Sequence, residues 1–535
     1  MQLLAFGIYF AVVLAIGIFF FLKSKGGGEK EYFLGGRQMG PWVSAMSAQA
    51  SDMSGWLLMG FPGAILAAGL GKVWIGIGLA LGTILNWILV AKRLRRFSAA
   101  AGDSITLPQY LTNRFATSNP ALKIACAVVF LVAFTVYVAS GFVAGTNVLL
   151  AVCPALAGRE LLAMVIFAAL ILCYTFLGGY KAVCWTDFFQ GIMMLCALLL
   201  VPIAMVKFGV FDSQWAGEFE AVTPKGEAFK AAFFGSNPFA ASWQDIVSGL
   251  GWGLGYFGMP HILVRFMGIK NPKDVKKSAW IACIWVVLSL GAAIAVGILG
   301  RTFLLQHAEG VESLALKLLP ARAQQMVFVE IVNNVFPAFV AGILLAAIIA
   351  AAMSTADSQL LVASSAFSSD FYQPVVRKNT ATDAEMLWVG RFVVMIVAFV
   401  AFYIAASGLG KEGSWANSIM DMVENAWGLF GAAFGPVVIL SLFWRRFNYA
   451  GALAGIVGGA VVDGAWLLAP VLKGTEVVDG VEQVVAKSLS QGLGVYEIVP
   501  GFVAGLVLAV VVTLATKKPG AEVDAIYEKA TSEAA

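Results

Sequence analysis

Apolar runs of about 20 residues follow one another along the whole chain, separated by short charged segments, and this pattern limits the fold more than any other feature. A helix of about 20 apolar residues is long enough to span the hydrocarbon core of a bilayer. The chain is 60% hydrophobic and only 12% charged, whereas roughly a quarter of the residues of a soluble domain are charged. The sequence therefore predicts an all-α polytopic membrane protein.

The apolar runs give thirteen candidate spans. They lie at about residues 2–22, 41–68, 72–91, 122–150, 160–177, 187–207, 243–264, 278–300, 331–367, 387–408, 425–444, 449–470 and 497–516. The first run is long enough to span and has no basic segment before it, so we expect a membrane helix there and not a cleavable signal.

The distribution of Lys and Arg predicts the orientation, because short cytoplasmic segments are enriched in both. With the N-terminus outside, the basic clusters fall on the inner side, and the outer segments carry only scattered basic residues. The C-terminus is then cytoplasmic, and we expect the protein in the cell membrane. The inner clusters are Lys23, Lys25, Lys30 and Arg37; Lys92–Arg96; Lys270, Lys273, Lys276 and Lys277; Arg377 and Lys378; Arg445 and Arg446; and Lys517 and Lys518.

Several classes of site are not indicated by the sequence. The six cysteines form no CxxC pair, and the only two histidines, His261 and His307, are far apart, so neither a disulfide framework nor a zinc site is predicted. No nucleophile–base pair lies within the spans, and we expect neither an enzyme nor a nucleic-acid partner. Asp463, in the twelfth span, is isolated in the sequence, and we expect a structural role for it.

The second span contains a carboxylate at its middle, in the sequence Ser51-Asp52-Met53-Ser54-Gly55. A charged side chain at the bilayer centre costs at least about 2.5–3.5 kcal/mol unless a cavity, water or a cation receives it. The small neighbours predict that the helix unwinds here, which frees carbonyl groups for a cation. The alternative is that Asp52 bonds a neighbouring helix and only fixes the bundle.

The ninth span changes from an Ala- and Ile-rich run to Ser354-Thr355-Ala356-Asp357. Hard cations prefer oxygen ligands, and these hydroxyls, with carbonyls near Ala351, offer them. Asp357 is on the same side of the helix as Ser354. A Ser–Thr pair also commonly bonds only the carbonyl of its own helix, so both interpretations stand.

The seventh span combines aromatic residues with glycines. Trp252, Tyr256 and Pro260 recur every four residues and share one face, and the glycines between them allow a close approach by a backbone or a small solute. This stripe indicates either helix packing or ligand contact. Tyr137 in the fourth span is a further candidate contact.

At these residues the sequence resembles the sodium:solute symporter family, over about residues 5–516. The resemblance rests on several strings in the same order. They are Phe33-Leu34-Gly35-Gly36-Arg37, Ser51–Gly60, Gly178-Gly179, Trp185-Thr186-Asp187, Gly251–His261, Met353-Ser354-Thr355 and Phe430–Pro436.

The resemblance implies a LeuT-type core with a 5+5 inverted repeat. One repeat would be residues 41–207 and the other 243–444, with the extracellular segment 208–242 between them. The first helix with its cytoplasmic loop (1–40), spans twelve and thirteen (445–516) and the cytoplasmic tail (517–535) would be peripheral. The implied activity is sodium-coupled import of L-proline, with Na+, L-proline and membrane lipid as partners.

The resemblance also implies which residues form the sites. The sodium site would consist of Ala50, Met53, Ala351, Ser354 and Thr355, with Asp52 assisting. The substrate site would consist of Ser54, Gly55, Tyr137, Trp252, Tyr256 and Pro260. Arg37 and Asp187 also fall on positions of functional interest in the family.

Two positions depart from the family pattern. Met259 replaces a Gln, which bears on substrate specificity, and Asp357 replaces a residue that is uncharged in some relatives. A symporter of the same family for another amino acid, pantothenate or a sugar is the nearest alternative. An ion channel is a more distant one, because a channel needs a continuous polar pore.

Overall fold

The computed structural model describes residues 1–23, 29–177, 179–207, 219–222, 228–231, 241–306, 321–378, 380–411, 414–478 and 481–532. Gly178, His307 and most of segments 208–242 and 301–325 lie outside the described residues.

Long apolar helices make up most of the described chain, which confirms the predicted polytopic helical fold. Ten helical stretches in this part of the chain are long and apolar enough to cross a membrane. They are Gln2–Phe20, Trp56–Ala100, Ala121–Val152, Tyr180–Lys207, Pro272–Leu304, Ala338–Val376, Asp383–Ser407, Ile419–Phe443, Tyr449–Leu468 and Ile498–Ala515.

The helices of the first half are α1 (Gln2–Lys23), α2 (Glu29–Leu34), α3 (Pro41–Asp52), α4 (Phe61–Ala68), α5 (Val73–Leu85), α6 (Lys92–Ala100), α7 (Leu107–Arg114), α8 (Ala121–Val152), α9 (Glu160–Leu177), α10 (Tyr180–Lys207), α11 (Trp243–Gly251) and α12 (Pro260–Met267). Those of the second half are α13 (Val275–Gln306), α15 (Ala321–Gln325), α16 (Val327–Val335), α17 (Ala338–Ser365), α18 (Asp383–Ser407), α19 (Ile419–Phe443), α20 (Tyr449–Leu468), α21 (Leu489–Leu493), α22 (Ile498–Ala515) and α23 (Ala521–Thr531).

Two small antiparallel hairpins complete the described fold. Strand β1 (Phe219–Val222) pairs with β2 (Ala228–Ala231), and β3 (Leu472–Val478) pairs with β4 (Val481–Lys487). Both hairpins lie in segments that the charge pattern predicts to be extracellular.

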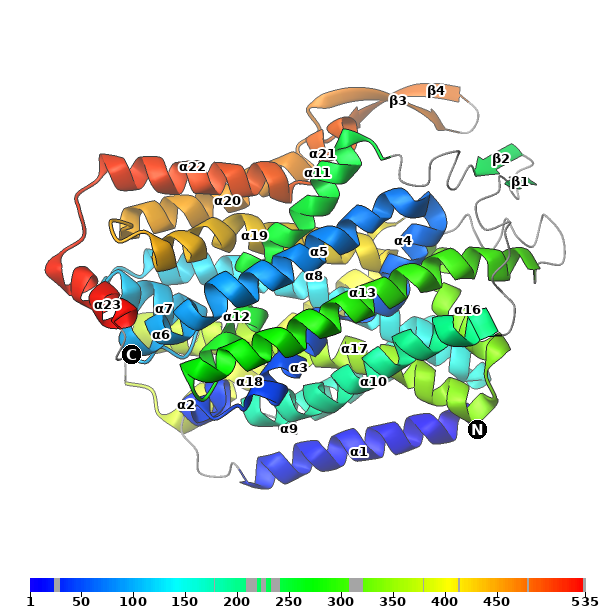
Figure 1. Ribbon diagram of the computed structural model, residues 1–535, viewed down its shortest axis with the longest axis horizontal. Helices are drawn as coiled ribbons and strands as arrows, with labels where there is room; N and C mark the ends of the chain where they lie inside the picture. The colour runs from blue at the N-terminus through cyan, green and yellow to red at the C-terminus, as the bar shows by residue number, and fades with distance from the viewer. Residues whose placement is uncertain are drawn as a thin grey trace.

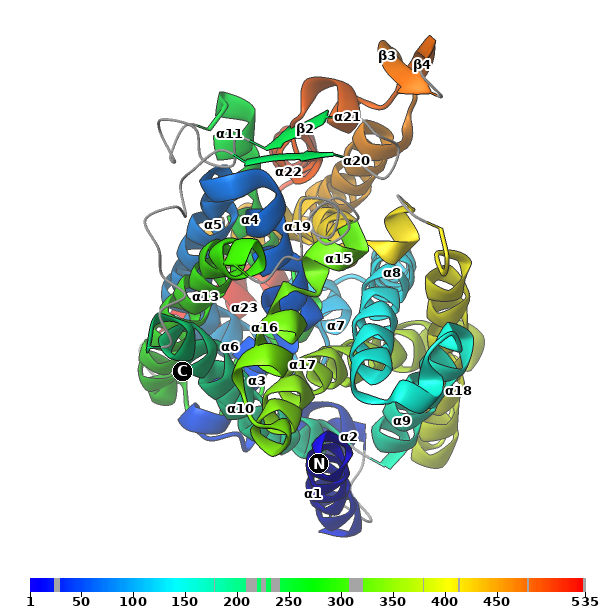
Figure 2. The same cartoon turned by 90° about the vertical axis from the view of Figure 1, so that its right-hand side faces the viewer.

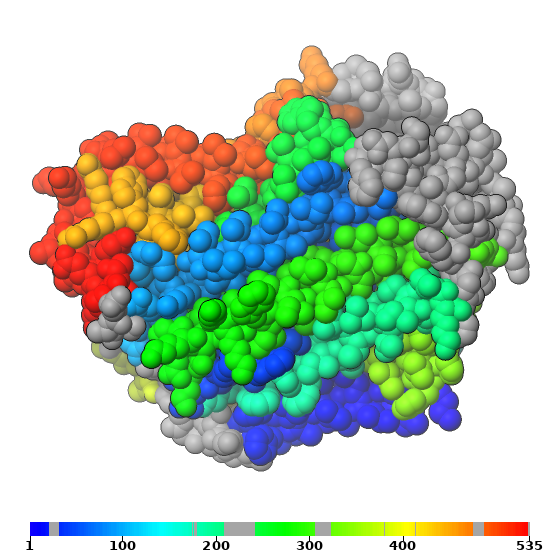
Figure 3. All heavy atoms as spheres, in the orientation of Figure 1, coloured from blue at the N-terminus to red at the C-terminus, as the bar shows by residue number. Residues whose placement is uncertain are grey.

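The long helices form a bundle in which the first and last spans lie on opposite sides (Figures 1 and 2). Helix α1 runs along one edge, and α20 and α22 run along the other. On the face in Figure 3, α5, α13, α10 and α1 lie side by side, each in contact with the next. Helices α6, α7 and α23 gather at one end, and the β3–β4 hairpin lies toward the other.

The second span is interrupted where the sequence predicts it. Helix α3 ends at Asp52, and Met53 leaves the helical conformation with ψ 77°. The chain resumes as a π-helical segment, Trp56–Gly60, which continues into α4. The unwound residues are fully buried, and such a break at membrane depth is tolerated only where protein or a cavity surrounds it.

Three other spans differ from the simple runs of the sequence. The seventh is broken at Gly258–Met259, where a 3-10 segment, Trp252–Phe257, ends and Pro260 begins α12. Pro337 separates α16 from α17, so the predicted run 331–367 is two helices, and α17 continues as a π-helical segment to Val376. The third span continues through a π-helical segment, Asn86–Ala91, into α6, beyond its predicted end.

Candidate sodium and substrate site

The break in the second span lies against α17, and a serine joins the two. The Ser354 hydroxyl donates a hydrogen bond of 2.8 Å to the Ala50 carbonyl of α3 and lies 3.1 Å from the Ala351 carbonyl. All three residues are buried. One hydroxyl and two carbonyl oxygens from separate helices therefore converge, and oxygen donors suit a hard cation such as Na+.

Two more residues of the predicted sodium site lie next to this contact. Thr355 is buried, and its Oγ1 has no hydrogen-bond partner in the described part of the chain. Met53 lies at the break, where the backbone is no longer helical. No group of three or more His, Cys, Asp or Glu side chains among the described residues could hold a metal ion.

Asp52 brings the sodium and substrate candidates together. Its Oδ2 accepts a 2.6 Å hydrogen bond from the Tyr256 hydroxyl, and its backbone carbonyl accepts a 3.2 Å bond from the Tyr137 hydroxyl. The side chain is fully buried, and Oδ1 has no partner among the described residues. A buried carboxylate oxygen without a partner is costly, and a cation or a donor group of a ligand would remove that cost.

Trp252 belongs to an aromatic cluster at the same depth. Its ring centroid lies 6.3 Å from that of Trp56 and 5.3 Å from that of Tyr496. The Trp427 indole donates a 2.7 Å hydrogen bond to the Trp252 carbonyl, and its ring lies 5.0 Å from that of Tyr256. The sequence did not indicate Trp427, because it contacts this stripe only through the fold.

The remaining substrate candidates flank the two breaks. Gly55 packs so closely on α8 that a Cβ on it would lie 2.7 Å from Ala144 Cβ. Ser54 lies at the centre of the break and is buried, and its Oγ accepts a long 3.4 Å bond from the Trp56 amide. Pro260 is the first residue of α12, directly after Met259.

Asp187 forms a fully buried ion pair that the sequence did not predict. Its Oδ2 lies 3.2 Å from Arg265 Nη2 and accepts a 2.7 Å hydrogen bond from Ser47. Arg265 also donates hydrogen bonds to Ser47, to the His261 carbonyl and to Ser358. The Ser358 hydroxyl in turn lies 3.4 Å from Asp357 Oδ1. The network therefore connects four helices, α3, α10, α12 and α17.

Arg37 bonds Ser98 of α6, and α6 and α7 lie together at one end of the bundle (Figure 1). Its guanidinium donates to Asp103 at 2.7 Å, to Ser98, to the Ser104 carbonyl and to the Met267 carbonyl. Burial lowers the pKa of Arg37, and the Asp103 carboxylate opposes that shift. Because Met267 is the last residue of α12, Arg37 holds that end of the seventh span in place.

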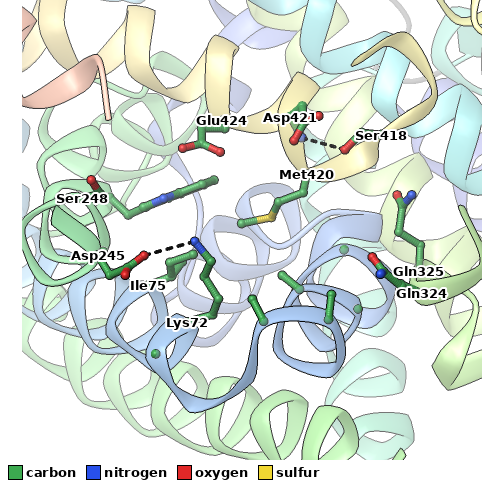
Figure 4. Close-up of a pocket in the computed structure, with 18 residues that line it drawn as sticks. Lys72, Ile75, Asp245, Ser248, Gln324, Gln325, Ser418, Met420, Asp421 and Glu424 are labelled. Carbon is green, nitrogen blue, oxygen red and sulfur yellow. Dashed lines mark hydrogen bonds and ion pairs between the residues drawn. The ribbon is translucent and has the colours of Figure 1, made fainter. Parts of the chain in front are cut away.

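A cavity of about 320 Å³ opens at the opposite end and reaches Trp252. In Figure 4, Lys72 and Asp245 face each other on one side, and Glu424 and Asp421 project from α19 on the other. Lys72 Nζ and Asp245 Oδ1 are 3.5 Å apart. We name this cavity the vestibule. It is lined by Gly60 and Trp252 at its inner part and by charged side chains of both signs, which suit ions and zwitterions.

Comparison with known proteins gives a consistent result. The sodium:solute symporter family model matches residues 32–459. The sodium/proline symporter of Haemophilus influenzae is 38% identical over 99% of this chain and 97% of its own length. Sodium/proline symporter 2 of Staphylococcus saprophyticus is 40% identical over 96% and 92%, and the osmoregulated proline transporter of Bacillus subtilis is 37% identical over 97% and 95%.

Solved structures agree at the level of the fold. A structure of a Na+-coupled sialic acid symporter in a substrate-bound outward-open state matches with a TM-score of 0.67, covers 97% of this chain and 98% of its own, and is 17% identical. A nucleobase-cation symporter in a closed conformation matches with a TM-score of 0.53 at 14% identity, covering 93% and 98%. Given the matched family model and these full-length relatives, the chain belongs to the sodium:solute symporter family.

Proposed function

We propose that this protein imports L-proline together with Na+ by alternating access across the cell membrane and leaves the solute chemically unchanged. The observation that carries the proposal is the meeting of Ala50, Asp52 and Ser354 with Tyr137 and Tyr256 at the break in the second span. Three relatives of nearly the same length are named for proline transport, and two of them for sodium as well.

We assign thirteen spans to the fold. The stretch Trp56–Ala100 contains a turn at Gly69, where φ is +78°, so it supplies the second half of span two and the whole of span three. The shorter apolar helix within α9 and the broken segment from α11 to α12 add the fifth and seventh spans. The basic clusters favour an outer N-terminus and a cytoplasmic C-terminus.

The two breaks support an inverted repeat. We assign the repeats to residues 41–207 and 243–444, so each begins with an interrupted span. Discontinuous helices at corresponding places of two repeats are typical of secondary transporters, and the substrate and ion bind there. Segments 1–40, 208–242, 445–516 and 517–535 are peripheral to this core.

At the sodium site, the ion would bind the carbonyls of Ala50, Met53 and Ala351 and the hydroxyls of Ser354 and Thr355. Ser354 already lies within hydrogen-bond distance of two of these carbonyls. Asp52 assists through its charge, and its free Oδ1 faces no protein donor in the described chain. Sodium bound here holds α3 against α17 and so fixes the shape of the break.

At the substrate site, proline must satisfy a carboxylate and a secondary ammonium. The amide groups freed at Ser54 and Gly55 are suited to the carboxylate. The faces of Trp252 and Tyr256 suit the cation and the pyrrolidine ring, and Tyr137 and Pro260 complete the pocket. Because sodium fixes the break that forms this pocket, each ligand raises the affinity for the other.

We infer that the conformation is outward-facing. The vestibule opens at the end that carries the predicted outer segments, while Arg37 closes the inner end through Asp103, Ser104 and Met267. Import then requires the Arg37 contacts to open and the vestibule to close. The inward step would separate Met267 at the end of α12 from the loop that carries Arg37.

The sodium gradient is sufficient to drive accumulation. One charge moving through a potential of ~100 mV releases about 2.3 kcal/mol, and a roughly tenfold sodium gradient adds about 1.4 kcal/mol. Together these allow on the order of several-hundred-fold accumulation for one Na+ per proline.

Uptake by proteoliposomes tests the proposal. Labelled L-proline should accumulate when an inward Na+ gradient is imposed and not when choline replaces Na+. An excess of unlabelled proline should abolish the signal, and pantothenate, sugars and other amino acids should not. Accumulation of one of these solutes in place of proline would overturn the substrate assignment, and currents far above the solute flux would favour a channel.

A further inference from the structure

Two buried carboxylates lie outside the sites described above. Asp463 of α20 is 1% exposed, and Glu497, directly before α22, is 2% exposed. Asp463 Oδ1 and Glu497 Oε1 have no hydrogen-bond partner in the described part of the chain. Glu497 Oε2 accepts a 3.2 Å bond from Ser490. Buried carboxylate oxygens normally have a hydrogen-bond partner, so these two oxygens need a partner that the described residues do not supply.

The side chains of Asp463 and Glu497 both border a notch in α19 formed by Gly428. A Cβ placed on Gly428 would lie 3.1 Å from Asp463 Oδ1 and 3.4 Å from Glu497 Cγ. The same Cβ would lie 3.3 Å from Tyr496 Cε2. Asp463 is therefore not isolated, as its sequence context indicated, because the fold brings a second carboxylate to it from 34 residues further along the chain.

No positive side chain balances this pair. Among the described residues neither Asp463 nor Glu497 takes part in an ion pair. The titratable groups that act on the pair from the elements packed against it are Tyr496 and, on α19, Glu424 and Asp421; Lys72 acts on Glu424 and is itself paired with Asp245. Two carboxylates in a buried site strongly disfavour each other's charge, so a cation is needed to neutralise one of them.

The vestibule lies one helical turn from the notch along α19. Glu424 lines the vestibule and lies four residues before Gly428, on the same face of α19. Its backbone carbonyl accepts a 2.7 Å hydrogen bond from the Tyr496 hydroxyl, which fixes Glu424 next to the residue that precedes Glu497. Asp421 lines the same cavity. Clefts with an excess of one charge concentrate ions of the opposite charge.

We propose that Asp463 and Glu497 bind one monovalent cation drawn from the vestibule, at a site separate from Ala50 and Ser354. The required chemistry is a single positive charge between two carboxylates. Na+ would bind the two free oxygens, and a proton would be shared between them. Either cation would hold the α20–α22 pair against α19, next to the wall of the vestibule.

The site can be tested by cation binding to the purified full-length protein, without reference to transport. We would measure bound ²²Na+ per chain, and the melting temperature at about pH 6 and pH 8, at constant ionic strength with choline as the replacement ion. The variants are Asp463→Asn/Glu497→Gln and Ser354→Ala. A matched control, Asp383→Asn/Glu522→Gln, removes two exposed acids at the starts of α18 and α23.

If the cation is Na+, the wild type and the control bind one more Na+ per chain than Asp463→Asn/Glu497→Gln, and Ser354→Ala retains that ion. If the cation is a proton, the double variant binds as much Na+ as the wild type. Raising the pH then lowers the melting temperature of the wild type and of the control, but not that of the double variant. Single variants, each with one carboxylate left, should also lose the extra Na+ and serve for the Na+ measurement if the double variant does not fold; in the proton case each keeps one titrating carboxyl group, so its pH dependence should be weaker than that of the wild type but not absent.

Equal Na+ binding together with equal pH dependence in the wild type and the variants would overturn the proposal. Because the measurement does not use proline, its failure is distinguishable from failure of the proposed transport function, which the uptake assay tests separately.

Discussion

At the scale of single residues, Asp52 connects the ion and the solute. Its carboxylate receives the Tyr256 hydroxyl and its carbonyl receives the Tyr137 hydroxyl, while Ala50, two residues earlier, receives Ser354. Sodium and proline would therefore bind to opposite sides of the same few backbone atoms. A ligand that moves this backbone changes both sites, and this is the physical basis of coupling in our proposal.

Asp52→Asn should weaken sodium binding while leaving the fold intact. Asparagine preserves the shape of the side chain but removes the charge, and hydrogen bonds to a charged group contribute about 1.5–3 kcal/mol. We expect the Na+ concentration for half-maximal proline uptake to rise by roughly 10- to 100-fold. Tyr256→Phe removes the hydrogen bond but keeps the charge, so its effect should be smaller. Unchanged sodium dependence in Asp52→Asn would remove Asp52 from the mechanism.

Ser354→Ala tests the α17 side of the sodium site. The substitution removes one oxygen ligand and the 2.8 Å bond to Ala50, which together should cost about 1.4 kcal/mol, or tenfold in sodium affinity. Ser364→Ala is the matched control, because that hydroxyl bonds only its own helix, at the Leu361 carbonyl. Equal sodium activation curves for the two variants would contradict the assignment of Ser354.

At the scale of elements, our proposal places both binding sites at the interrupted spans. The residues around the two breaks are closely packed. Helix α3 ends at Asp52, shortly before Gly55, which abuts Ala144 of α8, and α12 begins at Pro260, after the 3-10 segment ends at Phe257. Arg265 of α12 bonds Ser47 of α3 and pairs with Asp187 of α10. These contacts fix the position of both breaks relative to the continuous helices α8, α10 and α17.

Gly55→Ala should disturb the break by overpacking. The new Cβ would lie 2.7 Å from Ala144 Cβ, and extra methyl groups in a packed core cost about 1–3 kcal/mol. We expect slower proline uptake and a lower melting temperature. Ala144→Gly in the same chain should restore both in part, and the absence of any rescue would show that the close approach is not the cause.

Arg265→Met should strongly destabilise the protein, because it leaves Asp187 buried without its ion-pair partner. Breaking one side of a buried pair costs about 3–5 kcal/mol, whereas removing both sides costs much less. The double variant Arg265→Met/Asp187→Asn should therefore melt at a higher temperature than Arg265→Met alone. A double variant less stable than either single variant would indicate that the two residues act independently.

At the scale of the whole molecule, our proposal assigns the closed Arg37 end and the open vestibule to one side of a transport cycle. Arg37→Gln should shift the population toward the inward-facing state, since it removes the contacts to Asp103 and Met267. Cys184 on α10 is buried one turn from Tyr180, whose hydroxyl bonds Val264 of α12. We expect its alkylation, followed by site-resolved mass spectrometry, to become about tenfold faster, as for a 1.4 kcal/mol shift.

Arg377→Gln provides the control for this experiment, because Arg377 pairs with Glu385 on the surface and touches neither break. Equal alkylation of Cys184 in wild type, Arg37→Gln and Arg377→Gln would show that Arg37 does not hold the inner end closed.

The sequence predicted the overall architecture well because apolar length and charge are local properties. It also predicted the break at Met53–Gly55, where small and polar residues interrupt an apolar run. The break at Gly258–Met259 was not predicted, because glycines and aromatics alternate throughout that segment. Contacts such as Arg265 with Asp187, 78 residues apart, depend on the packing of several helices, and no local pattern encodes them.

The central claim is that sodium and proline bind to two sides of one break in the second span, and reciprocal binding tests it most directly. The dissociation constant of proline should be measured with the purified protein at low and high Na+, and that of Na+ with and without proline. The account predicts that both affinities rise by the same factor in the wild type and that this factor falls toward one in Asp52→Asn. Proline binding that is independent of Na+ in the wild type would contradict it.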